Sequence, residues 1–101
     1  MPMSCDRTSG ALTFVVSGEI DHHGAKGLLR TIDGELEKDL GRTVTVDLSG
    51  VSFMDSSGIA VLLRVYRRVG EIGGSVIVRG APEQAMKVLR AAGLPKLMRF
   101  E

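Results

Sequence analysis

An apolar strand pattern runs almost directly into an amphipathic helix pattern, and this is the feature that most constrains the fold of the chain. From Thr43 to Leu48, valine and leucine alternate with polar residues, which predicts a half-buried strand. The polar segment Asp55-Ser56-Ser57-Gly58 follows, and after it apolar residues recur at the i, i+3, i+4 and i+7 spacing of a helix. These helix positions are Ile59, Leu62, Leu63 and Tyr66. The pattern therefore predicts a strand, a polar elbow and a helix, with two serines at the helix N-terminus.

Two interpretations of the serine elbow follow from this placement. Unpaired backbone N–H groups and the positive end of the helix dipole favour an anion at a helix N-terminus, including a phosphate attached to a serine. Asp and Ser are also the usual N-cap residues, so one of Asp55, Ser56 and Ser57 is expected to close the helix. Two serines leave room for both roles, with one hydroxyl accepting the helix N–H bond while its neighbour faces water. Gly58 beside them would leave space for another protein to approach the backbone.

The rest of the chain alternates between strand and helix patterns. The expected elements are strands at 3–7 and 11–17 joined by a turn at Ser9-Gly10, a helix after Asp21, the strand at 43–48, the elbow helix, a strand at 76–78 covered on both faces, a helix opened by Pro82 and stopped by Gly93, and a short strand within 97–100. Such alternation implies right-handed crossovers. We therefore predict an α/β fold with a mixed, largely parallel sheet of about four to five strands and helices packed on it.

This topology predicts where the polar loops lie. Asp21 is a plausible N-cap for the helix that follows it, whose apolar stripe is Ala25, Leu28, Leu29, Ile32 and Leu36. If the strands before Gly18 and before Phe53 are parallel, their C-terminal ends lie at one edge of the sheet, where sites usually occur. We therefore expect the Asp21 loop to lie beside the Ser57 loop.

Three segments carry a resemblance to a known family. They are Gly18-Glu19-Ile20-Asp21-His22-His23, Phe53-Met54-Asp55-Ser56-Ser57-Gly58 and the stretch from Gly93 to Phe100. Together they resemble the anti-sigma factor antagonists of the STAS family, most nearly the branch that acts on the sporulation anti-sigma-F factor. The resemblance spans nearly all of residues 1–101, which implies a single STAS domain. It also leads us to expect that the nearest relatives continue for a helix-like segment beyond the match at Glu101.

The resemblance implies a partner-switching regulator of transcription with no catalysis of its own and no cofactor. Members of the family bind an anti-sigma factor that is a serine kinase, which frees a sigma factor. The same kinase then phosphorylates the antagonist on serine and switches it off, and a serine phosphatase reverses the modification. Matched residue by residue, the phosphoacceptor is Ser57, and Ser56 is assigned to the helix cap or to loop geometry.

A docking patch for the kinase is expected around the elbow. Its residues would be Asp21, His22, Asp55, Ser56, Ser57, Gly58 and Ile59. A phosphoserine brings about 1.5 to 2 negative charges, which beside Asp55 and Asp21 should repel acidic partner groups. The helix dipole can accommodate the same phosphate, so we expect a surface switch with little backbone change.

Other functional classes are open or disfavoured. The main alternative is a STAS module that regulates a stress-signalling or transporter complex. The adjacent His22-His23 pair does not share a helix face and has no Cys or Glu-x-x-His partner nearby, so a metal site is not expected. A serine hydrolase is disfavoured because Ser57 lacks the Gly-x-Ser-x-Gly elbow.

Charge and composition limit the classes of partner that the chain is expected to bind. A net charge of +1 and a pI of about 7.9, with three Phe, one Tyr and no Trp, argue against direct nucleic-acid binding. Arg64, Arg67 and Arg68 form either a basic patch that steers an acidic partner or an ordinary solvated helix face. The absence of a long apolar run and of a signal-peptide pattern favours a cytoplasmic protein without a membrane segment. The lone Cys5 is interpreted as a small strand residue.

Overall fold

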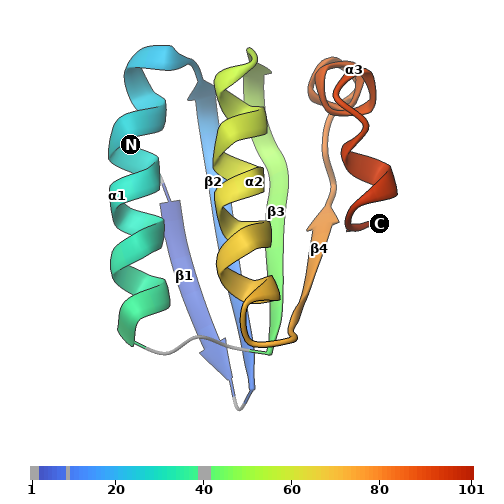
Figure 1. Ribbon diagram of the computed structural model, residues 1–101. Helices are drawn as coiled ribbons and strands as arrows, with labels where there is room; N and C mark the ends of the chain where they lie inside the picture. The colour runs from blue at the N-terminus through green and yellow to red at the C-terminus, as the bar shows by residue number, and fades with distance from the viewer. Residues whose placement is uncertain (1–2, 9, 39–41) are drawn as a thin grey trace.

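The computed structural model describes residues 3–8, 10–38 and 42–101 (Figure 1). Its elements in chain order are β1 (Met3–Thr8), β2 (Ala11–Ile20), α1 (His22–Lys38), β3 (Thr43–Met54), α2 (Ser57–Gly70), β4 (Ser75–Arg79), α3 (Glu83–Ala91), the 3₁₀ turn η1 (Leu94–Lys96) and β5 (Arg99–Phe100). The turn predicted at Ser9-Gly10 lies partly outside the described residues, because Ser9 is not described. The order of the expected elements is confirmed.

One five-stranded sheet, in the order β1-β2-β3-β4-β5, forms the base of the fold. β1 pairs antiparallel with β2, and β2, β3, β4 and β5 pair parallel to one another. The predicted α/β fold with a mixed, largely parallel sheet is therefore confirmed. Because β2 and β3 run in the same direction, their C-terminal ends meet at the upper end of the molecule in Figure 1.

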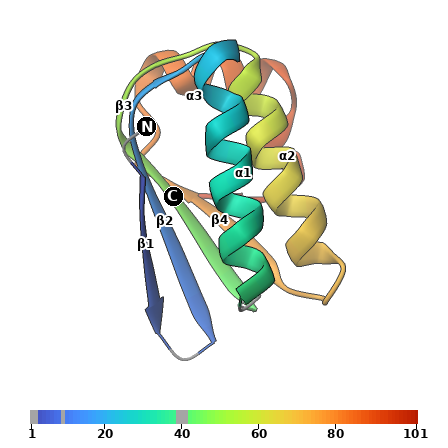
Figure 2. The ribbon, with the colours of Figure 1, turned by 90° about the vertical axis from the view of Figure 1, so that its left-hand side faces the viewer.

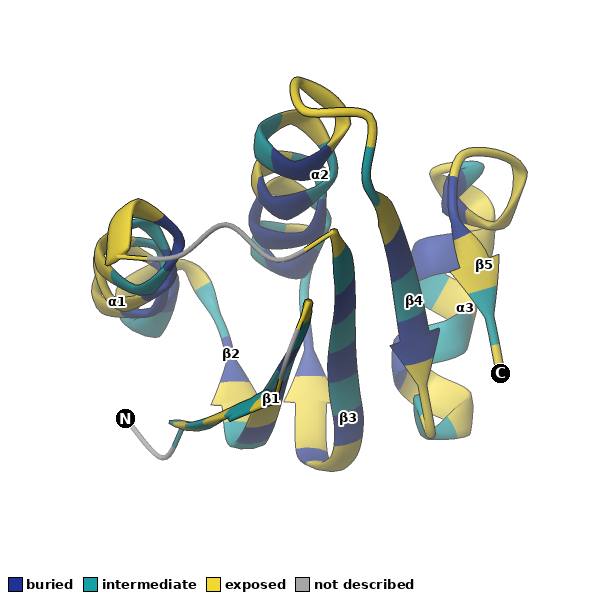
Figure 3. Ribbon diagram, turned by 90° about the horizontal axis from the view of Figure 1, so that it is seen from below, coloured by how far each residue is buried: buried dark blue, intermediate teal, exposed yellow. Residues whose placement is uncertain are grey.

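The core lies between the sheet and the pair of helices α1 and α2, which stand side by side on one face (Figures 2 and 3). Alternate strand residues point toward these helices and are buried, among them Leu12, Phe14 and Val16 of β2 and Val44, Val46 and Leu48 of β3. The apolar stripes of the helices, including Leu28 and Ile32 in α1, complete the core. This two-layer packing is what the period-two and helical patterns predict.

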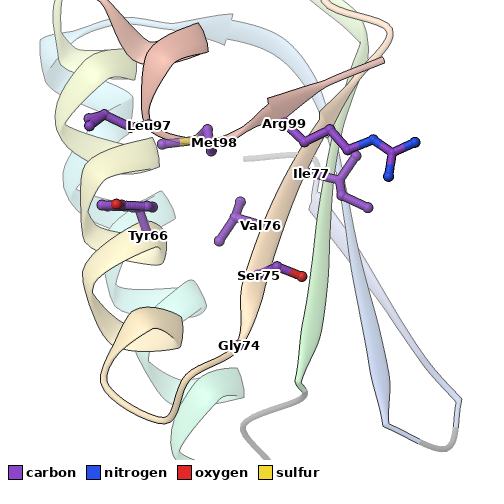
Figure 4. A pocket seen from close by; sticks show the side chains of 8 residues that line it. All are labelled: Tyr66, Gly74, Ser75, Val76, Ile77, Leu97, Met98 and Arg99. Carbon is purple, nitrogen blue, oxygen red and sulfur yellow. The ribbon is translucent and has the colours of Figure 1, made fainter.

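The strand β4 differs from its prediction as a strand covered on both faces. Val76 and Val78 are buried, whereas Ile77 between them is only half-buried. In Figure 4, Ile77 points away from α2, on the same side as Arg99. The run of three apolar residues therefore belongs to a strand that is fully covered on only one face.

The strand β3 extends six residues beyond the predicted end at Leu48, to Met54. β4 pairs only with its first part, from Thr43 to Asp47, so the remainder of β3 is bonded along one edge to β2. The register between β2 and β3 shifts twice on the way, between Val15 and Ser17 and between Gly18 and Glu19. The two strands nevertheless end together, with Ile20 opposite Met54, and this pairing positions the site.

The short helix α3 follows Pro82 and buries Ala85 and Leu89. It ends at Ala91, two residues before Gly93, whose φ of +76° lies in the left-handed region that glycine adopts without strain. The predicted helix stop at Gly93 is confirmed.

Candidate functional site

The two polar loops at the C-terminal ends of β2 and β3 lie against each other, as the topology predicts. The backbone N–H of Asp55 donates a hydrogen bond to the carbonyl of Ile20, at 3.1 Å. The backbone N–H of His22, the first residue of α1, donates to Oδ2 of Asp55 at 3.3 Å. Residues more than thirty positions apart in the sequence thus form one surface at this edge of the sheet.

Asp55 links the N-termini of both helices through a single carboxylate. While Oδ2 accepts from His22, Oδ1 accepts a 2.7 Å hydrogen bond from the backbone N–H of Ser57. The pKa of Asp55 is held below its ordinary value of 3.8, chiefly by the Ser57 N–H, with smaller contributions from the Ser57 hydroxyl and from His22. The carboxylate is therefore ionised at neutral pH, and its charge lies where two helix dipoles favour an anion.

Asp21 has a more local role at the start of α1. Its Oδ1 accepts a 2.7 Å hydrogen bond from the backbone N–H of Gly24, and its carbonyl accepts from the N–H of Ala25 at 2.9 Å. This is the N-cap arrangement, so the predicted capping role of Asp21 is confirmed.

One of the three residues expected to close α2 does so, and it is Asp55; the further expectation that a serine hydroxyl provides the cap is wrong. Ser56 occupies the N-cap position, but its φ of −62° and ψ of −15° are already helical, and its side chain makes no capping hydrogen bond. An N-cap residue normally adopts an extended conformation to turn its oxygen back toward the first N–H groups. The carboxylate of Asp55 takes that place instead. Ser56 is exposed, and Ser57 is half-buried as the first residue of α2.

Gly58 differs from what the sequence suggested for it, whereas Ile59 lies where its helical spacing predicts. Gly58 is buried, and a Cβ atom built on it would lie 2.5 Å from both Cγ and Sδ of Met54. Such a distance is shorter than van der Waals contact, so glycine at this position lets α2 pack on Met54. The space beside Gly58 is thus filled by the chain itself. Ile59 is half-buried and packs against the core.

Gln84 in the first turn of α3 is a site residue that the sequence analysis missed. Its Oε1 accepts a 2.8 Å hydrogen bond from the backbone N–H of Met54, and its Nε2 donates a 2.7 Å bond to the carbonyl of Met54. The only sequence signal is that this is the one glutamine of the chain. Nothing in its spacing connects it to a strand thirty residues earlier.

The sequence of the chain also matches a known protein family. The model of the STAS domain matches residues 3–101, which is nearly the whole chain. The chain belongs to the STAS domain family. The anti-sigma F factor antagonist of Paenibacillus polymyxa is 30% identical over 89 residues, which cover 88% of this chain and 76% of that protein. Its name describes a regulator that acts against an anti-sigma factor.

Solved structures share the fold of this STAS domain. The anti-sigma factor antagonist SpoIIAA in its unphosphorylated form aligns with a TM-score of 0.85 and 24% identity, over 99% of this chain and 88% of that one. The Bacillus cell fate determinant SpoIIAA in its phosphorylated form aligns with a TM-score of 0.76 and 24% identity, over 99% and 91%. The predicted STAS-type architecture is confirmed by these likenesses.

The arginines of α2 in this STAS domain form an interhelical cluster in place of a free basic patch. The Nη1 atoms of Arg64 and Arg68 lie 3.3 and 3.2 Å from Oδ2 and Oδ1 of Asp33 in α1. Arg67 is exposed and makes no ion pair within the described part of the chain. Two of the three arginines therefore join α1 to α2.

A half-open groove of about 410 Å³ lies away from the elbow, between the middle of α2 and the strands β4 and β5 (Figure 4). Tyr66, Val76, Leu97 and Met98 give it an apolar lining. None of the residues of the predicted docking patch borders it.

Within residues 3–8, 10–38 and 42–101, no three histidine, cysteine or carboxylate side chains gather closely enough to hold a metal ion. Over the same ranges, no helix combines the length and apolar composition needed to cross a membrane.

Proposed function

We propose that this STAS domain is an anti-sigma factor antagonist controlled by phosphorylation of Ser57. In this proposal it binds an anti-sigma factor that is a serine kinase and thereby releases a sigma factor in the cytoplasm. The kinase transfers the phosphoryl group of ATP to Ser57 and dissociates, and a serine phosphatase restores the active form. The domain has no catalytic role of its own.

One observation carries the proposal: the Asp55 carboxylate joins the first turns of α1 and α2 and presents Ser57 at their common edge. Ser57 begins a helix, where the positive end of the helix dipole favours a phosphate. The first N–H groups of this helix are already bonded to Asp55 and Ser56, so the dipole and not unpaired N–H groups supports the proposal. The P. polymyxa relative is named an anti-sigma F factor antagonist, and SpoIIAA, which shares the fold, has a phosphorylated form; both support an antagonist controlled by phosphorylation.

The docking surface in this proposal is the edge around the elbow. His22 and Ser56 are exposed there, and Asp21, Asp55, Ser57 and Ile59 are half-buried, so each offers some surface to a partner. Gly58 is buried and would contribute through the packing of Met54. The kinase would thus contact first turns of helices that are held together by hydrogen bonds before it binds.

Phosphorylation would switch binding off by electrostatics. A phosphoserine adds about 1.5 to 2 negative charges at neutral pH. Those charges would lie beside the Asp55 carboxylate, which already accepts from the Ser57 N–H at 2.7 Å. A partner surface that fits the unmodified edge would then meet added bulk and repulsion of its acidic groups, and the phosphate would have to lose water.

Phosphoryl transfer to the purified domain tests the acceptor directly. The domain is incubated with its cognate anti-sigma factor and ATP, and the modified residue is located by mass spectrometry. Ser57→Ala should abolish transfer, whereas Ser56→Ala, a matched change one residue away, should retain it. Transfer that persists in Ser57→Ala, or is lost in Ser56→Ala alone, would contradict the assignment of the acceptor.

A further inference from the structure

The backbone of Met54, the last residue of β3, would have no strand partner on its outer side. The neighbouring N–H of Asp55 points toward β2, where it bonds to Ile20. Alternation along a strand therefore turns the N–H and carbonyl of Met54 toward the β4 side. β4 pairs with β3 only from Thr43 to Asp47, so it does not reach this level.

Gln84 supplies the missing partner with both ends of one carboxamide. It accepts from the Met54 N–H at 2.8 Å and donates to the Met54 carbonyl at 2.7 Å, which reproduces the two bonds a paired strand would make. The helix that carries Gln84 is itself held in the core by Ala85 and Leu89, which are 1% and 0% exposed. The end of β3 is therefore anchored to a helix that packs on the core through its inner face, although Gln84 itself lies on the exposed side of that helix.

This anchor lies next to the proposed phosphorylation site. Met54 is followed directly by Asp55, whose carboxylate bonds the first N–H groups of α1 and α2. The side chain of Met54 is completely buried, and α2 packs on it through Gly58. Main chain and side chain of Met54 are thus held from two sides, three residues before Ser57.

We propose that Gln84 is a positioning residue for phosphoryl transfer to Ser57, acting through the backbone of Met54. This inference rests on the proposed function. Phosphoryl transfer depends on holding the attacking hydroxyl in line with the transferred group, and small displacements lower the rate sharply. The carboxamide of Gln84 bonds the Met54 backbone and so holds the strand end from which the elbow projects.

Gln84→Leu tests the inference, because leucine is similar in size and removes both hydrogen bonds. Lys87→Leu is the matched control, since Lys87 is an exposed residue one turn later in the same helix. Both variants are assayed with the cognate anti-sigma factor and ATP at a temperature where circular dichroism shows them fully folded. Gln84→Leu should lower kcat on the order of tenfold to a hundredfold with a smaller change in KM, and Lys87→Leu should leave both near the wild-type values.

Amide hydrogen exchange provides a second measurement that does not depend on the kinase. The N–H of Met54 should exchange faster in Gln84→Leu, while the buried strand amide of Val46 keeps its wild-type rate. Wild-type kcat in Gln84→Leu, with wild-type phosphorylation intact, would overturn the positioning role and leave the proposed function standing. A wild-type domain that its kinase never phosphorylates would instead overturn the proposed function and this inference with it.

Discussion

Asp55 shows how one side chain can organise a site that two distant loops share. Its two oxygens accept from backbone N–H groups of different helices, and these bonds hold its pKa below the ordinary value. Asp55, Ser56 and Ser57 could each have capped α2, and the Asp55 carboxylate does so because Ser56 is already helical in its backbone angles. The presence of a cap was predictable from the sequence, whereas the residue that provides it depends on backbone angles that the sequence alone does not define.

Asp55 should make the stability of the domain depend on acid pH. Its folded pKa is lowered, so the ionised carboxylate stabilises the fold fully above the ordinary value of 3.8, and this contribution is lost as the pH falls below it through the folded pKa. The free energy of unfolding of Asp55→Asn, measured by urea titration, should lie below that of the wild type at neutral pH. The difference should shrink in acid.

Asp6→Asn, a change at an exposed residue of β1, is the control for this titration. A gap between wild type and Asp55→Asn that stays constant far below pH 3.8 would mean that the two hydrogen bonds do not favour the charged form.

Gly58→Ala should destabilise the domain through the contact with Met54. The added Cβ would lie 2.5 Å from two atoms of that side chain, and such overpacking costs about 1–3 kcal/mol. The matched control is Gly34→Ala within α1, where no atom lies within 4 Å of the added Cβ and alanine should stabilise the helix by about 0.5–1 kcal/mol. Chemical denaturation measures both, and a neutral Gly58→Ala would contradict the packing role.

Whole elements were predictable where the burial pattern is regular. Val44, Val46 and Leu48 alternate because one face of β3 meets the helices, and the sequence shows that period directly. Beyond Leu48 the alternation of buried and exposed residues ends, because the strand continues through register shifts against β2. The buried residues there are Val51 and Met54, which are three positions apart. The end of β3 could be recognised only from its pairing.

The contact between α3 and the end of β3 is likewise a feature that the sequence pattern does not reveal. Gln84 has the sequence context of an ordinary polar residue in the first turn of a helix. Its two hydrogen bonds to Met54 depend on β4 pairing only with the first part of β3 and on α3 lying beside the end of β3. Neither condition leaves a period or a motif in the sequence.

The ion pairs that Asp33 of α1 makes with α2 should contribute modestly to the free energy of unfolding. Arg64 and Arg68 both pair with this carboxylate, but all three side chains are partly exposed, so the pairs are screened by solvent. Asp33→Ala should lower the free energy of unfolding by about 0.5–1 kcal/mol at low salt and by less at high salt. Arg67→Ala, which removes an arginine with no ion pair among the described residues, should leave stability nearly unchanged. Equal effects of the two changes would contradict the cluster.

At the scale of the molecule, the parallel sheet gathers the start of each main helix at one edge. α1 and α2 meet through Asp55, and α3 reaches the same edge through Gln84 and Met54. The core below this edge is closed by buried residues from every one of these elements. A charge added at the edge can therefore change what binds there without requiring the core to repack.

Phosphorylation of Ser57 should accordingly leave the fold nearly unchanged. Amide chemical shifts of the modified and unmodified domains should differ around Asp21 to Gly24 and at residues 54–60, and they should coincide in β1 and β4. Shift changes spread through those distant strands would indicate refolding and would contradict a surface switch.

Release of a sigma factor is the measurement that tests the central claim most directly. A preformed complex of the cognate anti-sigma factor and its sigma factor is titrated with the unmodified domain, with the phosphorylated domain and with Ser57→Ala, and free sigma factor is measured. The unmodified domain and Ser57→Ala should both release sigma factor, and the phosphorylated domain should not. Equal release by the phosphorylated and unmodified domains, or none by either, would contradict a phosphorylation-controlled antagonist.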